Sequence, residues 1–274
     1  MAGQDNSDWL GLSGRVCVVT GGGGGIGRAT ALSFAQAGAR VAAIDRDERG
    51  LEITHAELLK LGRDHVVAPC DTSNADSVTS AAEKIEKSLG SCHVLVNTAA
   101  VLRPGGLDTL SLAEWNTVMS VNLTGYFLCA QIFGRQMRAQ GGGSIVHIAS
   151  VAGSNAQGHS GAYSVSKAGV VMLSQQLANE WGPYGIRSNV VSPGLVVTPM
   201  SQAFYDTPGV KERREAVVPM RRIGMPQDMA NAILFLASDR ASYISGDEIT
   251  VDGGFVRMLM NLVPRPGFED KSNR

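Results

Sequence analysis

Short apolar runs alternate with longer amphipathic segments along most of the chain. Seven runs of four to six residues are rich in apolar and β-branched side chains, a pattern typical of buried strands. Their alternation with helical segments favours a parallel sheet whose crossover connections are helices. The predicted strands are 15–20, 39–44, 65–68, 93–96, 144–148, 186–191 and 248–251.

Segment 74–89 shows the helical pattern most clearly. Its apolar positions recur at steps of four, three and four residues, so they share one face of a helix. Ser73 has an acid, Asp76, three residues further on, which is the spacing of a capping box, so we expect a helix to begin there. The apolar positions are Val78, Ala82, Ile85 and Leu89.

Length and composition set the domain organisation that we expect. A chain of 274 residues with 44% hydrophobic content can form one large α/β domain or two small ones. Because no internal repeat or low-complexity linker interrupts the pattern, we favour a single doubly wound domain over 1–274, with its core at about 12–254. The proline-containing and then polar end, 255–274, is expected to be a tail.

Charge and cysteine usage limit the possible partners and compartment. The formal net charge of −1 and the isoelectric point near 6.5 give no basis for binding nucleic acid or an anionic membrane, so a small molecule or a protein is favoured. The four cysteines form no Cys-x-x-Cys pair, and no histidine cluster has metal-ligand spacing, so we expect buried thiols and no metal. Without a targeting segment or a long apolar run, the protein is expected to be soluble and cytoplasmic.

A glycine-rich turn follows the first predicted strand. Residues 21–25 are all glycine, Gly27 follows, and 28–37 has helical composition. Glycines allow a tight turn, a close approach to a pyrophosphate, and helix amides that point at its charge, although a flexible loop is the simpler alternative. Asp45 ends the next strand, where an acid can bind both hydroxyls of an adenosine ribose. NAD is therefore the expected cofactor, with Arg46 leaving NADP as the alternative.

Tyr163 and Lys167 stand four residues apart, with Ser150 thirteen residues before the tyrosine. On a helix they share a face, so the ammonium can lie beside the phenol and stabilise its phenolate. Lowering a tyrosine pKa by roughly three units requires about 4 kcal/mol. One charge about 4 Å away at an effective dielectric of about 20 supplies that much. Ser150 is preferred over Ser154 and Ser160 because it follows a predicted strand, where ligands bind.

These motifs together resemble the short-chain dehydrogenase/reductase family. The resemblance covers about residues 12–254 and implies a Rossmann-type domain with a seven-stranded parallel sheet, hydride transfer between NAD(H) and a secondary alcohol or ketone, and a homotetramer. It rests on Thr20-Gly-x-x-x-Gly25-x-Gly27, Asn122, Ser150 and Tyr163-x-x-x-Lys167, with further similar stretches at Cys70-Asp71, Val94 to Asn97, Ser192-Pro193-Gly194, Thr198-Pro199-Met200 and Val251 to Gly254.

The resemblance also implies roles for the matched residues. Tyr163 would be the general acid and base, Ser150 would hydrogen-bond the developing oxyanion, and Lys167 would also hold the nicotinamide ribose. Asn122 would position a water that relays protons to Lys167. The implied cofactor-binding residues are Gly21, Gly25, Ile26, Gly27, Asp45, Asp71 and Thr72 near the adenosine and pyrophosphate, Asn97 at the adenosine ribose, Tyr163 and Lys167, and Val196 and Thr198 at the carboxamide.

One stretch departs from the family pattern. Where the family has Asn-Asn-Ala-Gly, this chain has Asn97-Thr98-Ala99-Ala100. Thr98 replaces an amide with a smaller hydroxyl near the sheet centre, and Ala100 adds a Cβ where the backbone approaches the cofactor. The change at Ala100 is therefore expected to affect the fit of the cofactor at this point.

The predicted substrate lining is mostly apolar, which suits an uncharged secondary alcohol or ketone, and 200–222 resembles a substrate lid. We expect His147 to be structural and His159 to be a possible substrate contact. Apolar side chains in 255–263 are expected to pack on a neighbouring subunit. The expected lining is Val101, Leu102, Val151, Asn155, His159, Leu195, Ala203, Phe204 and Tyr205.

Two other functions compete with this interpretation. A 3-oxoacyl-carrier-protein reductase would use the mixed-charge run 211–215 to receive an acidic carrier, although two glutamates dilute that run and Asp45 disfavours NADP. A non-catalytic dinucleotide-binding sensor or scaffold would be expected to lack a residue of the active centre. Because the serine, tyrosine and lysine are all present, an enzyme is favoured.

Overall fold

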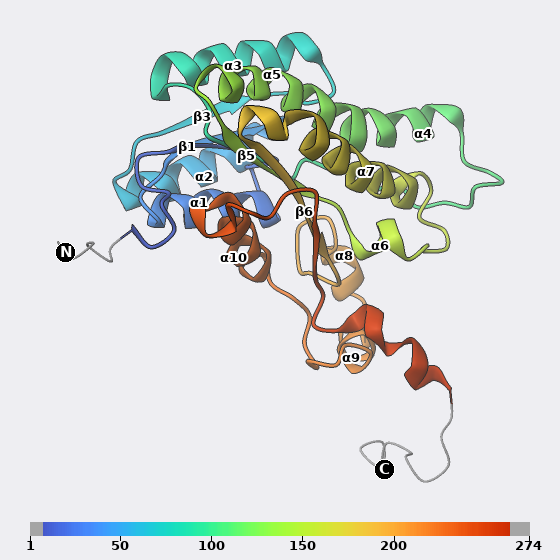
Figure 1. Cartoon of the computed structure of the whole chain (residues 1–274). Coiled ribbons are helices and arrows are strands. Elements are labelled where there is room, and N and C mark those ends of the chain that lie inside the picture. The colour runs from blue at the N-terminus through green and yellow to red at the C-terminus, as the bar shows by residue number, and fades with distance from the viewer. Residues whose placement is uncertain (1–7, 264–274) are drawn as a thin grey trace.

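The computed structural model describes residues 8–263 and contains a seven-stranded parallel sheet in the order β3-β2-β1-β4-β5-β6-β7 (Figure 1). Every predicted strand is present, and each begins and ends within two residues of its predicted first and last residues. The doubly wound Rossmann-type fold is therefore confirmed. The strands are β1 (Val16–Thr20), β2 (Arg40–Asp45), β3 (His65–Pro69), β4 (Val94–Asn97), β5 (Gly143–Ile148), β6 (Ile186–Pro193) and β7 (Glu248–Val251).

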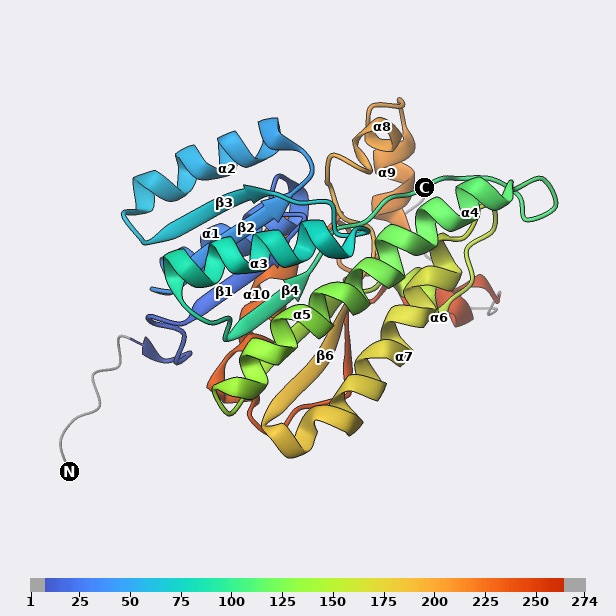
Figure 2. The ribbon, with the colours of Figure 1, turned by 90° about the horizontal axis from the view of Figure 1, so that it is seen from above.

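Helices cover both faces of the sheet (Figure 2). One face carries α1 (Gly25–Gln36), α2 (Glu48–Leu61) and α10 (Pro226–Ala237), and the other carries α3 (Ala75–Leu89), α5 (Gly125–Ala139) and α7 (Tyr163–Trp181). Within residues 8–263, no helix combines the length and apolar character that crossing a membrane requires. The remaining elements are α4 (Leu112–Met119), a π-helical turn (Ser120–Thr124), α6 (Val151–Ser154), α8 (Gln202–Tyr205), α9 (Val210–Ala216) and 3-10 segments at Gly182–Tyr184, Asp239–Ala241 and Phe255–Leu262.

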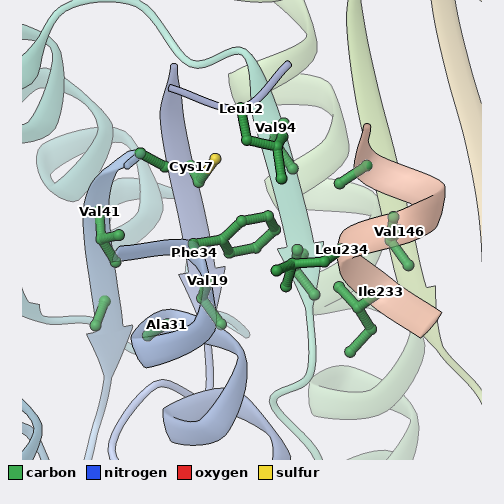
Figure 3. Packing of buried hydrophobic residues seen from close by; sticks show 14 of the residues in the cluster. Leu12, Cys17, Val19, Ala31, Phe34, Val41, Val94, Val146, Ile233 and Leu234 are labelled. Carbon is green, nitrogen blue, oxygen red and sulfur yellow. The ribbon is translucent and has the colours of Figure 1, made fainter. Parts of the chain in front are cut away.

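Phe34 of α1 lies at the centre of the core on the first face. It packs with Ile233 and Leu234 of α10 against Val19 and Val94 of the central strands (Figure 3). Full burial of such a side chain contributes about 1.5–3 kcal/mol, and Phe34 is completely buried. This packing fixes α1 on the sheet and so holds the glycine turn that precedes it.

Helix α3 confirms the predicted apolar stripe but corrects the predicted cap. The four stripe residues are buried against α5. The N-cap is Asn74, whose side chain accepts a hydrogen bond from the Ser77 amide, whereas the Ser73 hydroxyl donates to the carboxylate of Asp71 at 2.7 Å. A charged carboxylate is a stronger acceptor than the alternatives at this position, so Ser73 turns away from the helix. The four cysteines are buried and unpaired, as expected.

The strand order reverses between β1 and β4, which leaves a crevice beyond the carboxyl ends of these two strands. Thr20 and Thr98 tie the two strand ends together at this point. The Thr98 hydroxyl donates to the Thr20 carbonyl at 2.5 Å, and the Thr20 hydroxyl accepts from the amides of Thr98 at 3.0 Å and Ala99 at 3.2 Å. Thr98, which departs from the family pattern, thus forms a direct hydrogen-bonded link between the two central strands.

Candidate active site

A cavity of about 870 Å³ lies at the carboxyl ends of the central strands. Residues from the glycine turn, from the end of β2 and from the start of α7 all reach it, although they are far apart in the sequence. Most of the residues predicted for the site line this one cavity. They are Gly21, Gly25, Ile26, Gly27, Asp45, Asp71, Thr72, Ser150, Tyr163, Lys167, Val196 and Thr198.

Two positions of the turn require glycine. Gly21 has a φ of +66°, and a Cβ there would lie 2.6 Å from the Thr98 hydroxyl oxygen. A Cβ on Gly27 would collide with the carbonyl of Gly21. The turn can therefore pass closely over the strand end only with these residues, as the sequence predicts.

Helix α1 begins directly after this turn and points its first amides at the cavity side. Its N-terminus has no side-chain cap and no acidic residue in its first turn, so the first amides are open to an anion. Arg28, which also lines the cavity, holds the turn, because its side chain donates to the Gly23 carbonyl and to the Thr54 hydroxyl. The donors and the space together fit the pyrophosphate of a dinucleotide.

Two acids line the adenosine side of the cavity. Asp45 accepts hydrogen bonds from the amides of Gly23 at 2.9 Å and Asp47 at 3.0 Å. Each of its oxygens retains a lone pair for a ribose hydroxyl. Asp71 accepts from the hydroxyl and amide of Ser73, and these bonds hold the pKa of the Asp71 carboxyl below its usual range. Both carboxyl groups are therefore fixed in place, and the lowered pKa keeps Asp71 ionised at neutral pH.

Tyr163 and Ser150 lie together at the other end of the cavity. Ser150 caps α6, where its side-chain oxygen accepts from the Ala152 amide at 3.1 Å. Burial raises the pKa of the Tyr163 phenol, and a hydrogen bond with Ser150 opposes that change. The expected lowering of the Tyr163 pKa is thus not present in the protein alone, because desolvation outweighs the other influences.

Lys167 is turned more deeply into the protein than the sequence predicts. Its ammonium donates to the Ile148 carbonyl at 2.7 Å and to the Tyr126 hydroxyl at 3.3 Å, and lies 5.7 Å from the centre of the Tyr163 ring. Burial lowers the pKa of Lys167 to about 7. An ammonium out of water needs strong acceptors, and a backbone carbonyl satisfies it better than a neutral phenol. The Lys167 ammonium therefore hydrogen-bonds inward while it also lies over the Tyr163 ring, on the helix face that the sequence predicts.

Asn97 and Asn122 are brought near the site but do not line the cavity. Asn97 is completely buried and donates toward His147 and the Tyr126 carbonyl, so its side chain faces the protein interior and not a ribose. Asn122 binds the backbone of Val101 through both its oxygen, at 2.8 Å, and its amide nitrogen, at 3.0 Å. Its side-chain oxygen is therefore already engaged. The proton-relay water that the family resemblance implies would have to bind another atom of Asn122.

Sequence reasoning missed three residues at or behind the cavity. Tyr126 stands in an apolar helical stretch and looks like ordinary core, and Arg28 and Arg214 look like surface charges. Arg214 also lines the cavity, where its guanidinium lies over the rings of Phe204 and Tyr205. Of the expected substrate lining, Val101, Leu102, His159, Leu195, Phe204 and Tyr205 reach the cavity, whereas Val151, Asn155 and Ala203 do not.

The chain is similar in sequence and structure to known dehydrogenases and reductases. A family model described as Enoyl-(Acyl carrier protein) reductase matches residues 21–256. D-threitol dehydrogenase of Mycolicibacterium smegmatis is 39% identical, over 89% of this chain and 94% of that protein. A 3-oxoacyl-acyl-carrier-protein reductase of Thermotoga maritima is 37% identical, over 89% and 99%. The crystal structure of levodione reductase has a TM-score of 0.84 at 33% identity, over 88% and 97%.

The Rossmann-type fold and these relatives together define an oxidoreductase that acts on alcohols or ketones. The chain belongs to the short-chain dehydrogenase/reductase family, for which NAD(P) is the typical cofactor.

Proposed function

We propose that this protein oxidises a secondary alcohol to a ketone, or reduces the ketone, with NAD(H) as cofactor and Tyr163 as the proton-exchanging group. The observation that carries the proposal is that Ser150, Tyr163 and Lys167 line the same cavity as the glycine turn and Asp45. When bound there, the nicotinamide ring would accept or supply the hydride.

The side chains of the site transfer the proton and stabilise the charges that develop during the reaction. Tyr163 takes the proton of the substrate hydroxyl in oxidation and returns it in reduction. Ser150 donates a hydrogen bond to the substrate oxygen, while its own oxygen accepts from the Ala152 amide. The Lys167 charge stabilises the phenolate that forms when Tyr163 gives up its proton.

We propose NAD in preference to NADP because the Asp45 side chain lines the cavity at the end of β2, where a 2′-phosphate would have to lie. A carboxylate accepts hydrogen bonds from two ribose hydroxyls and repels a phosphate. Arg46 also lines the cavity and could pair with such a phosphate, so the preference depends on which of the two groups dominates. The Gly23 amide bond to Asp45 fixes the carboxylate and favours NAD.

The carrier-protein reductase remains the second candidate because one such enzyme is 37% identical to this chain. Its acidic carrier would need a basic surface near the cavity. On α9, however, Lys211 lies 3.9 Å from Glu215, and Arg214 is folded onto two aromatic rings. This pairing leaves a weak basic surface, so a free small-molecule alcohol is the better substrate.

We also propose a cytoplasmic homotetramer built from one domain, in which 200–222 acts as the substrate lid. Large apolar side chains are exposed on the helices of one face, which suits a contact with further subunits. Four buried, unpaired cysteines are compatible with a reducing compartment. The exposed side chains are Leu112, Phe127, Val165 and Met172.

An absorbance assay tests the function. The purified full-length protein is given NAD or NADP and a panel of polyols, cyclic secondary alcohols and hydroxysteroids, and NADH or NADPH formation is followed in parallel with a carrier-linked 3-oxoacyl substrate. Turnover of a free alcohol with NAD supports the proposal, and preferential turnover of the carrier-linked substrate establishes the second candidate. Dinucleotide binding without any turnover indicates a sensor or scaffold.

A further inference from the structure

A second tyrosine lies directly behind the proposed catalytic pair. Tyr126 of α5 is buried, its hydroxyl donates to the Ile148 carbonyl at 3.2 Å, and the Lys167 ammonium donates to that hydroxyl at 3.3 Å. Lys167 donates to the same carbonyl. The three groups thus form a closed hydrogen-bonded triangle, at the end of β5, that holds the ammonium from the side of the sheet.

The ring of Tyr126 is itself held in place by its neighbours. It stacks on His147, with ring centres 5.7 Å apart and planes 18° apart, and the Lys167 ammonium lies 5.0 Å from its centre. Burial and then the charge of Lys167 lower the pKa of His147 to about 3, so the imidazole is neutral. Because Asn97 donates to its Nδ1, His147 carries its proton on Nε2.

This arrangement is costly if it serves only packing. Neither Nε2 of His147 nor Oδ1 of Asn97 has a hydrogen-bond partner within residues 8–263, and each unpaired buried polar group destabilises the fold. Apolar side chains would fill the same space without that cost. The position of the cluster against Lys167 supplies a functional reason for it.

We propose that Tyr126 is a positioning residue for Lys167: its hydroxyl, held by the Ile148 carbonyl, anchors the ammonium behind Tyr163 and keeps it charged. This proposal rests on the proposed function of Tyr163 and Lys167. Tyr126 does not line the cavity and touches neither substrate nor cofactor. It acts only through the lysine.

The charge of Lys167 is sensitive to such an anchor. Within the described residues, the titratable groups that face it are Tyr126 on α5, His147 on β5 and Tyr163 on its own helix, and none of them is a carboxylic acid. Burial acts against the charged form, and no carboxylate opposes that effect. The hydrogen-bond acceptors of Lys167 therefore determine the pH up to which its amine stays protonated. Removal of the Tyr126 hydroxyl should therefore let Lys167 lose its proton at lower pH.

The variant Tyr126→Phe keeps the ring and its stacking and removes only the hydroxyl. We expect kcat for alcohol oxidation to fall roughly tenfold, which is the size of a hydrogen bond to a charged group. The loss of activity at high pH should also move to lower pH by about one unit, which corresponds to the same fold-change. The matched control is Tyr184→Phe, because Tyr184 does not line the cavity and its ring packs under the guanidinium of Arg138.

A second measurement uses the cofactor-free protein and does not depend on turnover. The pKa of Lys167 is lowered in the folded state, so the unfolded chain binds more protons above about pH 7, and stability rises with pH through that range. In Tyr126→Phe this rise should begin at lower pH, as measured by urea unfolding from pH 6 to pH 10. If Tyr126→Phe fails to fold, Tyr126→Met, which fills the space without ring or hydroxyl, is used for both measurements.

The outcomes separate this inference from the proposed function. An active wild type whose pH profile and unfolding curve are both unchanged in Tyr126→Phe overturns the positioning role of Tyr126. A lower stability that is the same at every pH, with an unchanged rate profile, also overturns it, because that result describes a structural residue. A wild type without turnover overturns the proposed function, whereas the unfolding measurement still reports the contact between Tyr126 and Lys167.

Discussion

The carboxylate of Asp45 accepts a hydrogen bond from the backbone amide of Gly23 at 2.9 Å, so the residue that faces the adenosine end of the cavity is tied to the glycine turn itself. A Cβ on Gly23 would lie 2.9 Å from the same carboxylate oxygen, which shows how closely the two segments approach. The proposed selection of the cofactor by Asp45 and the shape of the turn therefore depend on the same hydrogen bond.

Asp45→Ser should shift the cofactor preference toward NADP. The serine removes the charge that repels a 2′-phosphate and leaves Arg46 free to pair with it, and repulsion at close range is large enough for at least roughly a tenfold change. The measurement is the ratio of kcat/KM with NADP to kcat/KM with NAD, for the wild type and the variant. An unchanged ratio would show that Asp45 serves the turn and not the choice of cofactor.

Tyr163→Phe should reduce turnover by at least about 10²-fold, because general acid and base catalysis contributes roughly 10² to 10⁴. The ring remains and only the exchangeable proton is lost, so NAD binding, measured by calorimetry, should be retained. Tyr243→Phe is the control, since Tyr243 is fully exposed and does not line the cavity. Near-normal hydride transfer by Tyr163→Phe with a true substrate would falsify the mechanism.

Lys167→Met should change the stability of the cofactor-free protein in a manner that depends on pH. The pKa of Lys167 is lowered to about 7 in the folded state, so the full cost of burying its charge is present below that pH and decreases as the pH rises toward the unfolded value. The methionine removes this cost, although at every pH it also removes one of the two side-chain donors to the Ile148 carbonyl, the other being the Tyr126 hydroxyl. Urea unfolding should therefore show the variant gaining most relative to wild type at about pH 6 and least at about pH 10. A difference that does not vary with pH would mean that Lys167 is not buried as a charge.

Asn122→Ala should destabilise the fold by about 1–3 kcal/mol per buried group left unpaired. The side chain binds both the amide and the carbonyl of Val101, and it also donates to Ser166. Chemical unfolding measures the loss, and Asn155→Ala is the control, because Asn155 is exposed and makes a single side-chain bond, to the Val151 carbonyl. Equal effects of the two substitutions would contradict the structural role of Asn122.

The strands and the cavity-lining residues were predictable because they depend on local pattern and on topology. Buried parallel strands have to be continuously apolar, and their carboxyl ends meet at one edge, so Gly21, Asp45 and Ser150 were predicted to meet. No long-range contact had to be known for that. The same reasoning predicted the stripe on α3, whereas its cap depended on a competing acceptor, Asp71, outside the helix.

The direction of buried polar side chains was not predictable in this way. Helical spacing places Lys167 and Tyr163 on one face, but it does not show that the Ile148 carbonyl offers the ammonium a better acceptor on the inner side. Asn97 likewise ends a strand that faces the crevice, yet its side chain turns to His147. Such choices depend on acceptors from other segments of the chain, which periodicity does not encode.

Truncation of the C-terminal segment after Arg257 should weaken assembly or raise the KM for substrate. The 3-10 segment Phe255–Leu262 begins beside the end of the lid, since the Met220 amide donates to the Gly253 carbonyl at 3.3 Å. Leu259 and Met260 are 71% and 59% exposed, and such apolar surface favours a partner subunit. The last residues, 264–274, lie outside the described part of the chain.

Sedimentation velocity and substrate kinetics compare the truncated protein with the full chain. The double variant Leu259→Ser, Met260→Ser tests the apolar contact alone. If the truncated protein keeps both its assembly and its KM, the segment does not contact a neighbouring subunit in the way proposed.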